Sequence, residues 1–432
     1  MSPEKNFRAP RGTADILPED QPLWSHVFRV VNRVAREFGY SRIDTPLFEA
    51  TDLFKRGVGS ETDIVQKEMY SFEDHGGDGL TLRPEGTAAV CRAYIEHGMA
   101  SRPQPVRLFY AAPMFRYERP QAGRYRQFHQ FGIEAIGDPS PAVDAEVIEM
   151  GWRFIAELGL HDVTLRLNSI GDPSDRVAYN QALRDYYSAH LDDLPKVDRD
   201  RLDRAPLRVL DSKEPESQAL ADGAPKSIDY LGNEASSHFE QLISLLEGLK
   251  SVHPDFSYRL DHRLVRGLDY YNRTVFEFEP VEARGQSTLL AGGRYDPLME
   301  IVGGPATPAI GFAAGLERLI QECRKYEVPV SPPDSPDAVV IALGETALGP
   351  AATLAAGLRA RGASVILAPQ RSMKAQMRYA HHAGARYALI LGDKEIERGV
   401  VGVKPMRGDG QFEASLTDVA ALHKAISKAE RG

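Results

Sequence analysis

The sequence predicts an α+β body with a mainly antiparallel sheet flanked by helices, a helical insertion, and a C-terminal α/β domain. Strand-like alternation with period two precedes residue 170 and returns from residue 256, as in YRLDHRLVRGLDYYNRTVFEFEP. The segment 171–255 is instead rich in Asp, Lys, Ser and Pro and has a helical pattern. Beyond residue 337, strands and helices alternate, which is typical of a mostly parallel sheet.

The part before the insertion mixes short strands with helices. In chain order we expect a helix over 22–38, a strand into Pro46, a strand over 80–83, a helix from Pro84 to about His97, a hairpin over 106–137 and a helix over 142–158. The helix at Pro84 is expected because proline is tolerated at the first helical position.

The part after the insertion ends in a proline-rich linker, VPVSPPDSPD (328–337). Before it, AIGFAAG leads into the helix LERLIQECRK. After it we expect a strand over 338–343, a helix over 348–361, a strand over 363–368, a helix over 372–383, strands over 387–391 and 400–406, and a helix over 418–428.

Length and composition indicate a globular protein with several cores. A chain of 432 residues predicts two or three domains. We expect no signal peptide and no membrane span, because no apolar run reaches the roughly 18 residues that a span needs. The two cysteines, Cys91 and Cys323, lack metal-site spacing and favour a reducing compartment over a thiolate zinc site.

The charge is distributed unevenly along the chain. The net charge is −9, which by itself argues weakly against a nucleic-acid partner. Residues 331–432, however, hold 13 basic and 10 acidic side chains and are therefore mildly basic. This asymmetry indicates either a polyanionic partner or ordinary variation between domains.

One stretch, FRYERPQAGRYRQFHQFGIE (115–134), interleaves arginines with aromatic residues around a turn-forming centre. Alternation on the second strand places four residues on one face: Phe128, Gln130, Gly132 and Glu134. A ring, an amide, a gap and a carboxylate suit a polar small-molecule pocket. Arg116, Glu118 and Phe128 together could hold a nucleotide. The alternative is a salt-bridged hairpin with a buried phenylalanine, but four arginines have few acidic partners nearby.

Two further segments carry candidate ligand contacts. In TLRPEGTAA (81–89), Glu85 and Thr87 stand at a helix N-terminus, where they could grip an ammonium group or simply cap the helix. In LVRGLDYYN (264–272), the glycine after Arg266 allows a backbone bend that aims the guanidinium inward. The alternative there is a loop arginine beside a packed tyrosine pair.

The segment AIGFAAGLERL (309–319) has small residues at a strand-to-helix turn, which permit close approach of a ligand. Arg318 lies in the first helical turn, where the dipole disfavours a cation, so an external anion is indicated. The alternative is an ordinary exposed helix start. Because the chain has no phosphate-binding glycine loop, a nucleotide would bind through arginines on an antiparallel sheet.

In this order, these segments resemble those of a class II aminoacyl-tRNA synthetase, and within that class of histidyl-tRNA synthetase. The segments that carry the resemblance are RGTADILPED (11–20), IDTPLFEATDLF (43–54), FRYERPQAGRYRQFHQ (115–130), RGLDYYNRTVFE (266–277) and GFAAGLERL (311–319). The resemblance implies a catalytic domain in two parts, 1–170 and 256–327, around the insertion 171–255. It implies that 328–337 is a linker and 338–432 an anticodon-binding domain.

The resemblance also assigns roles to residues. ATP would be bound by Arg116, Glu118, Arg124, Phe128 and Arg318. Histidine would be bound by Glu85, Thr87, Gln130, Glu134, Arg266, Tyr270 and Tyr271. Arg266 and Arg116 would be catalytic, with Arg266 in the place of a metal ion, so no metal held by the protein is expected. Arg119 and Gln121 at the hairpin tip would meet the acceptor end of the tRNA.

The implied activity is ATP-dependent activation of L-histidine and its transfer to tRNA(His), with Mg²⁺ on the nucleotide. A cytoplasmic homodimer without a membrane partner is implied as well. The alternative is a non-catalytic, histidine-sensing regulatory paralogue of an ATP phosphoribosyltransferase. The presence of residues 338–432 and of all four motif arginines favours the ligase.

Overall fold

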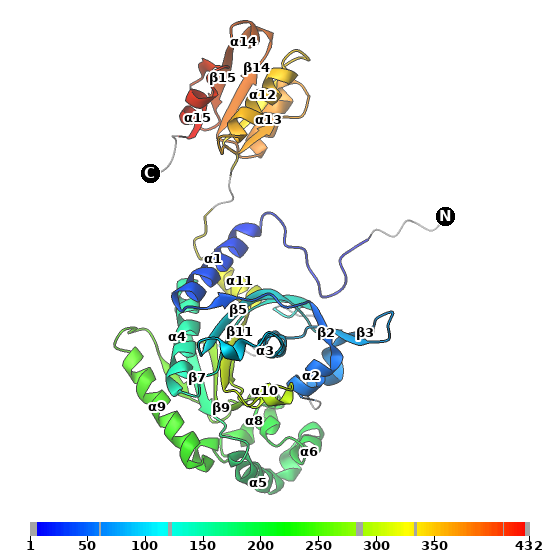
Figure 1. The fold of residues 1–432 in the computed structure, drawn as a ribbon, viewed down its shortest axis with the longest axis vertical. Helices are drawn as coiled ribbons and strands as arrows, with labels where there is room; N and C mark the ends of the chain where they lie inside the picture. Colours follow the sequence, from blue (N-terminus) through cyan, green and yellow to red (C-terminus); the bar gives the residue numbers. More distant parts are fainter. Residues whose placement is uncertain are drawn as a thin grey trace. The chain divides into compact units, whose positions relative to one another are not determined.

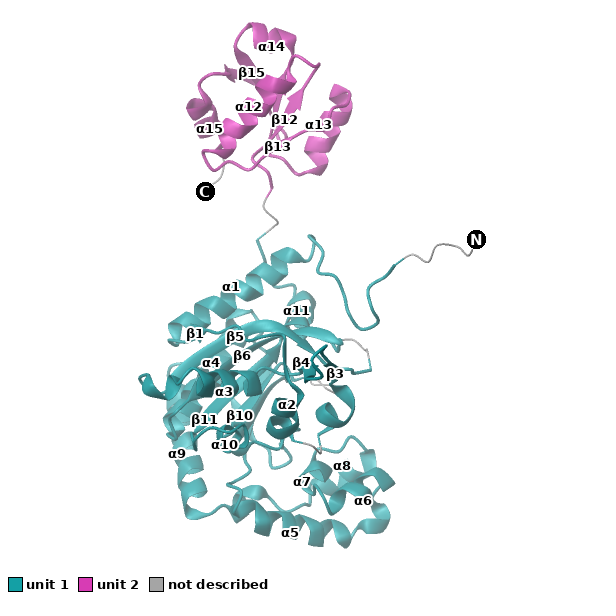
Figure 2. Ribbon diagram, turned by 45° about the vertical axis from the view of Figure 1, so that its right-hand side comes forward, with its two compact units in different colours: residues 1–331 teal, residues 332–432 magenta. Residues whose placement is uncertain are grey.

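The computed structural model describes residues 7–59, 62–119, 123–281, 288–331, 335–408 and 410–427. The chain forms two compact units, residues 1–331 and 332–432 (Figure 2). No helix in the described ranges is long and apolar enough to cross a bilayer.

The first unit is built on an eight-stranded sheet with the strand order β1-β5-β6-β11-β10-β9-β7-β8 (Figure 1). These strands are β1 (Ser41–Arg42), β5 (Val106–Phe115), β6 (Gln127–Ile136), β7 (Val163–Ser169), β8 (Tyr258–Leu260), β9 (Asn272–Pro280), β10 (Leu290–Arg294) and β11 (Ala309–Gly315). Within the described part of this sheet, only the two edge pairs, β1 with β5 and β7 with β8, are parallel. The predicted mainly antiparallel sheet is therefore confirmed.

Helices cover both faces of this sheet because alternate residues of each strand are apolar on opposite sides. One face packs against α1 (Gln21–Glu37), α4 (Pro141–Glu157), α9 (Asn233–Leu249) and α11 (Leu316–Lys325). The other face packs against α3 (Thr87–Glu96), α5 (Asp175–Ser188) and α10 (Leu298–Ile301). Strand β6 contributes Phe131, Ile133 and Ala135 to the first core, so its remaining residues face the second side.

The helix expected at Pro84 begins three residues later, as α3 at Thr87. The carboxylate of Glu85 accepts hydrogen bonds from the backbone N–H groups of Thr87 (2.7 Å) and Ala88 (2.9 Å). Because these donors have no partner within the helix, the carboxylate fixes the helix start there. The capping interpretation of Glu85 is thus confirmed as a structural role.

Smaller elements complete this unit. A second sheet has the strand order β2-β4-β3. Its strands are β2 (Phe48–Ala50), β3 (Tyr70–Glu73) and β4 (Gly79–Leu82), and α2 (Thr51–Val58) directly follows β2 in the chain. The segment between β7 and β8 is helical as expected. Besides α5 and α9 it contains α6 (Lys196–Leu202), α7 (Leu207–Leu210) and α8 (Pro215–Ala221).

The second unit has a five-stranded sheet with the order β13-β12-β14-β15-β16. Its elements are β12 (Ala338–Ala342), α12 (Leu348–Arg359), β13 (Val365–Leu367), α13 (Met373–His382), β14 (Tyr387–Leu391), α14 (Asp393–Glu397), β15 (Val400–Pro405), β16 (Phe412–Ser415) and α15 (Val419–Ser427).

The α/β class of this unit is confirmed, but the expectation of a mostly parallel sheet is wrong. Strand β12 pairs in parallel with β13 and β14, whereas β15 pairs antiparallel with both β14 and β16. Only residues 392–399 separate β14 from β15. A parallel crossover needs a dozen residues or more, so this short connection returns the chain antiparallel.

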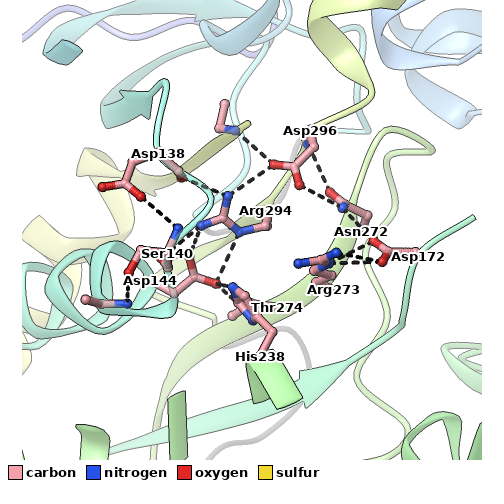
Figure 3. A network of polar contacts seen from close by, with 12 residues as sticks. Asp138, Ser140, Asp144, Asp172, His238, Asn272, Arg273, Thr274, Arg294 and Asp296 are labelled. Atoms are coloured by element: carbon pink, nitrogen blue, oxygen red, sulfur yellow. Dashed lines mark hydrogen bonds and ion pairs between the residues drawn. The ribbon is translucent and has the colours of Figure 1, made fainter. Parts of the chain in front are cut away.

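A buried polar network joins the ends of several elements in the first unit (Figure 3). Arg294 at the end of β10 and Asp144 of α4 form an ion pair, and both side chains are 0% exposed. Arg294 also donates to the Asp138 carbonyl (3.1 Å) and to Asp296 (3.2 Å). Thr274 of β9 donates to Asp144 at 2.6 Å. The pair therefore ties α4, β9, β10 and the loop after β6 together.

Replacing Arg294 with methionine should destabilise the first unit by about 3–5 kcal/mol, because Asp144 would stay buried without its counter-charge. Urea unfolding followed by tryptophan fluorescence measures this, since both tryptophans, Trp24 and Trp152, lie in this unit. The double variant Arg294→Met/Asp144→Leu should recover part of the loss. The control Arg33→Met breaks an exposed pair and should cost at most about 1 kcal/mol. Equal effects of Arg294→Met and Arg33→Met would contradict the role given to the buried pair.

Candidate active site

A cavity of about 260 Å³ opens on the second face of the large sheet, between the β5–β6 hairpin, β9–β10 and the start of α11. It is lined by seven of the residues that the sequence nominated: Arg116, Glu118, Arg124, Phe128, Gln130, Arg266 and Arg318. The hairpin residues therefore meet residues that follow them by more than a hundred positions along the chain.

The hairpin presents its arginines to one end of this cavity. Arg116 donates to the Pro84 carbonyl at 2.8 Å, and its guanidinium carbon lies 5.4 Å from the centre of the Phe128 ring. Arg124 forms an ion pair with Glu118 at 3.2 Å. A cation beside an aromatic ring, with a carboxylate nearby, suits a ligand that combines negative charge with a flat polar ring.

Two more arginines extend the positive charge along the cavity. Arg318 donates to the Thr288 carbonyl at 2.6 Å. Burial, and next the charge of Arg124, lower the pKa of Arg318. Arg266 forms an ion pair with Glu277. Unlike Arg266, Arg318 forms no ion pair with a carboxylate within the described chain. An anionic ligand would supply the missing counter-charge.

Four residues after Gln130, on the same face of β6 but not in the cavity lining, is a buried carboxylate, Glu134, which is 1% exposed. It accepts hydrogen bonds from the hydroxyls of Thr87 (2.8 Å), Tyr295 and Tyr110 (3.4 Å). Burial raises its pKa to about 8 against the hydrogen bonds of Tyr295 and Thr87, which lower it. A cationic ligand next to Glu134 would favour loss of the carboxyl proton. An N–H group of the ligand could then donate a strong, charge-assisted hydrogen bond to the carboxylate.

Two glycines make room for this carboxylate. A Cβ on Gly132 of β6 would lie 2.2 Å from the Tyr110 ring. A Cβ on Gly311, which pairs with Glu134 across β6 and β11, would lie 2.2 Å from its Oε2. The gap that the sequence placed between Gln130 and Glu134 is therefore filled by the Tyr110 side chain, which donates to Glu134.

Besides Oε2 of Glu118, which forms an ion pair with Arg124, two buried polar atoms at the cavity have no hydrogen-bond partner among the described residues. They are the Oε1 acceptor of Gln130 and the Nε donor of Arg266. Buried groups of this kind are costly unless a ligand or water satisfies them. One unsatisfied acceptor and one unsatisfied donor in the same cavity suit a ligand that carries both an ammonium and an acidic group.

The other nominated residues lie around this cavity. The buried rings of Tyr270 and Tyr271 are 4.7 Å apart, and Tyr270 meets Tyr295 edge to face at 5.8 Å. The guanidinium carbon of Arg266 lies 5.7 Å from the Tyr271 ring centre. Arg119 lines a larger adjoining groove together with Arg124. Gln121 lies outside the described residues.

Sequence reasoning missed Tyr110, Tyr295 and Glu277. The strand pattern of β9, TVFEFE, holds the signal for Glu277, because it interrupts an apolar strand with acidic residues on one face. Tyr110 could be inferred only from the register, which sets it opposite Gly132. Nothing local marks Tyr295, because its contact with Glu134 spans 161 residues of sequence.

Comparison with known proteins identifies the family of this chain. The family model described as histidyl-tRNA synthetase matches residues 12–319. A second, described as anticodon binding domain, matches residues 337–426. The chain belongs to the histidyl-tRNA synthetase family.

Relatives with this family's name match nearly the whole chain. A histidine–tRNA ligase of Dehalococcoides mccartyi (strain BAV1) is 50% identical over 95% of this chain and 97% of its own. That of Caldicellulosiruptor saccharolyticus is 45% identical over 96% and 98%. The crystal structure of apo S. aureus histidyl-tRNA synthetase superposes with a TM-score of 0.80 at 36% identity, covering 98% and 100%. The predicted class II aminoacyl-tRNA synthetase, a histidine–tRNA ligase, is therefore confirmed at the level of the family.

The regulatory alternative gains no support from these matches. A Bacillus halodurans structure described as an ATP phosphoribosyltransferase regulatory subunit/histidyl-tRNA synthetase is 24% identical with a TM-score of 0.61. At that identity the likeness shows a shared fold alone.

Glu134 should make the stability of the free protein depend on pH. The folded chain holds this proton up to about pH 8, whereas the unfolded carboxyl ionises near its ordinary value of 4.5. The folded state therefore binds more protons in this window, and its stability falls as pH rises. Urea unfolding at pH 6 and 8.5 should show wild type losing about 2 kcal/mol more than Glu134→Gln.

The matched control is Glu96→Gln, which removes an exposed carboxylate from the same region at α3. Its pH dependence should equal that of wild type. Identical pH dependence of wild type and Glu134→Gln would show that Glu134 is ionised in the folded free protein.

Proposed function

We propose that this synthetase binds ATP with Arg116, Glu118, Arg124, Phe128 and Arg318. The Phe128 ring would stack on adenine, and Glu118 would accept from its exocyclic amine. Arg116 would hold the α-phosphate, Arg124 the outer phosphates, and Arg318 the γ-phosphate end. The convergence of these arginines around one stacking ring supports this proposal.

Histidine would occupy the deep end of the same cavity. Its α-ammonium would be bound by Gln130, Thr87 and Glu85, and the partnerless Oε1 of Gln130 is the observation that carries this assignment. Glu134 and Tyr271 would face the imidazole nitrogens, with Tyr270 beside them. An analogue without the imidazole N–H would lose the charge-assisted contact with Glu134, which is how the site would select histidine.

The chemistry needs positioning more than acid–base catalysis. The histidine carboxylate is already ionised, and one of its oxygens attacks the α-phosphorus of ATP. The bond to the β-phosphate oxygen breaks, giving histidyl-adenylate and pyrophosphate. Arg266 and Arg116 would stabilise the charge that develops at the α-phosphate, which is the main contribution available to such a site.

Mg²⁺ would accompany the β- and γ-phosphates. Among the described residues no group of three or more His, Cys, Asp or Glu side chains could hold a metal ion. This fits an ion held mostly by phosphate oxygens and water, with one or two carboxylates. Glu277, which lines the cavity, could supply one. Bound there, Mg²⁺ would neutralise charge on the departing pyrophosphate.

Transfer would follow when the 3′-terminal ribose hydroxyl of tRNA(His) attacks the activated carbonyl and releases AMP. The hairpin tip, with Arg119 and Gln121, would meet the acceptor end. Arg119 lines the adjoining groove of about 1010 Å³. Residues 338–432 would bind the anticodon. The catalytic domain would comprise 1–170 and 256–327, interrupted by 171–255 and joined by 328–337.

We further propose a homodimer in the cytoplasm. Three neighbouring apolar side chains, Leu47, Phe48 and Phe72, are 46, 50 and 45% exposed, and the two phenylalanine rings meet edge to face. An exposed apolar patch of this kind favours a protein interface. Cys91 and Cys323 are both unpaired, as suits a reducing compartment.

Pyrophosphate exchange into ATP tests the activation step. With each amino acid supplied in turn, exchange should depend on histidine alone. Absence of exchange with histidine would contradict the proposed ligase activity. Exchange with another amino acid would contradict the proposed specificity for histidine.

Arg266→Ala should lower the exchange rate about 100- to 1000-fold, the usual loss when one preorganised donor to a developing charge is removed. Glu277 keeps contacts with Arg166 and Thr288, so the variant should fold, as circular dichroism would check. Arg266→Lys keeps the positive charge but lacks the planar guanidinium group, so its exchange rate should lie between those of wild type and Arg266→Ala. A folded Arg266→Ala with near-wild-type exchange would refute the assigned role.

A further inference from the structure

A second cavity, of about 220 Å³, lies where the helical segment 171–255 meets the loop that carries Arg266. Its walls come from α5, from the segment 204–208 that leads into α7, and from the loop 265–269. Its polar lining consists of Arg176, Asn180, Arg204, Arg208, Arg266 and Asp269. Arg266 also lines the active-site cavity, so the two cavities share one residue.

The arginines of this cavity are poorly neutralised. Arg208 is paired with Asp269 at 3.0 Å and also donates to the Gly267 carbonyl at 3.1 Å. Arg204 donates only to a backbone carbonyl, that of Asp200, at 3.3 Å. The side chain of Arg176 has neither a hydrogen bond nor an ion pair within the described part of the chain, although its backbone N–H donates to the Asp172 carbonyl. Two guanidinium groups therefore face one cavity without a carboxylate contact.

Burial makes this arrangement costly. It lowers the pKa of Arg176 despite the more distant charges of Asp269 and Asp172. The Oδ1 of Asn180 is also buried without a partner, and because the two ends of an amide are interchangeable it can present N–H₂ instead. A bound oxyanion would pair with both arginines and accept from the amide, and guanidinium forks match phosphate geometry.

The cavity has the right size for such a group. At about 30 Å³ for each water, it holds roughly seven waters, or a five-atom phosphate group with part of its hydration. Its remaining lining is apolar, from Ile170, Pro206, Leu207, Val265 and Leu268, and would exclude competing water.

We propose that this cavity is a phosphate-binding site distinct from the ATP site. Its ligand is a phosphate group, either free or part of the RNA backbone. An anion here would compete with Asp269 for Arg208 and so act on the 265–269 loop next to Arg266. The site would let the helical segment sense an anion and pass the effect to the catalytic loop.

Calorimetric titration of the full chain with inorganic phosphate tests the free ligand. The variant Arg176→Gln/Arg204→Gln should lose one class of sites or bind it at least tenfold more weakly. Phosphate binding at the ATP arginines should persist in every variant. The matched control is Arg184→Gln, an α5 arginine outside the cavity that donates to the Asp203 carbonyl, and it should titrate as wild type. Arg204→Gln alone provides a second variant at an exposed position should the double variant fold poorly.

Filter binding of the cognate tRNA transcript over a range of salt concentrations tests the RNA source. If the phosphate belongs to tRNA, the double variant should reduce the salt slope of log K by about one or two. If it is free, tRNA binding should not change. Unaltered titration with phosphate together with unaltered tRNA binding would overturn the proposal.

Histidine-dependent pyrophosphate exchange in phosphate-free buffer should be unchanged in the double variant. Because neither binding assay requires catalysis, failure of this proposal and failure of the proposed function can be told apart.

Discussion

The Glu134 end of the candidate site depends on one buried ion pair, Arg294 with Asp144. Arg294 ends β10, and the next residue, Tyr295, donates to Glu134. Asp296, also bound by Arg294, accepts from Asn272 at 3.1 Å, the residue that follows the Tyr270–Tyr271 pair. Two charges without solvent hold their place only when their hydrogen bonds are complete, so the pair fixes the strand ends that carry these tyrosines.

The burial of Glu134 follows from the same frame. Burial raises the pKa of this carboxyl, whereas the three hydroxyls that donate to its oxygens lower it, and no cation contacts it within the described residues. Glycine at 132 and 311 leaves space for Tyr110 and for the carboxylate itself. Close packing thus holds one acceptor in place, whereas the arginines line an open cavity.

Sequence alone predicted those parts of the site that depend on local patterns, such as the alternation of side chains along a strand. The face of β6 with Phe128, Gln130 and Glu134 follows from alternation, and the position of Arg318 follows from its place in a helix start. The Arg294–Asp144 pair joins residues 150 apart, and neither position has a local pattern that names its partner. The antiparallel return of β15 follows from the short connection 392–399, which the alternation of strands and helices does not reveal.

The single strand β6 carries contacts for both proposed substrates, and this restricts how the site can evolve. Consecutive side chains of a strand point to opposite faces, so one inserted or deleted residue would turn Phe128 and Gln130 toward the α-helical core and bring Phe131 and Ile133 into the cavity. Changes in amino-acid preference that involve this strand must therefore arise by substitution and not by insertion or deletion. Length variation is tolerable only beyond its ends, as in the hairpin tip.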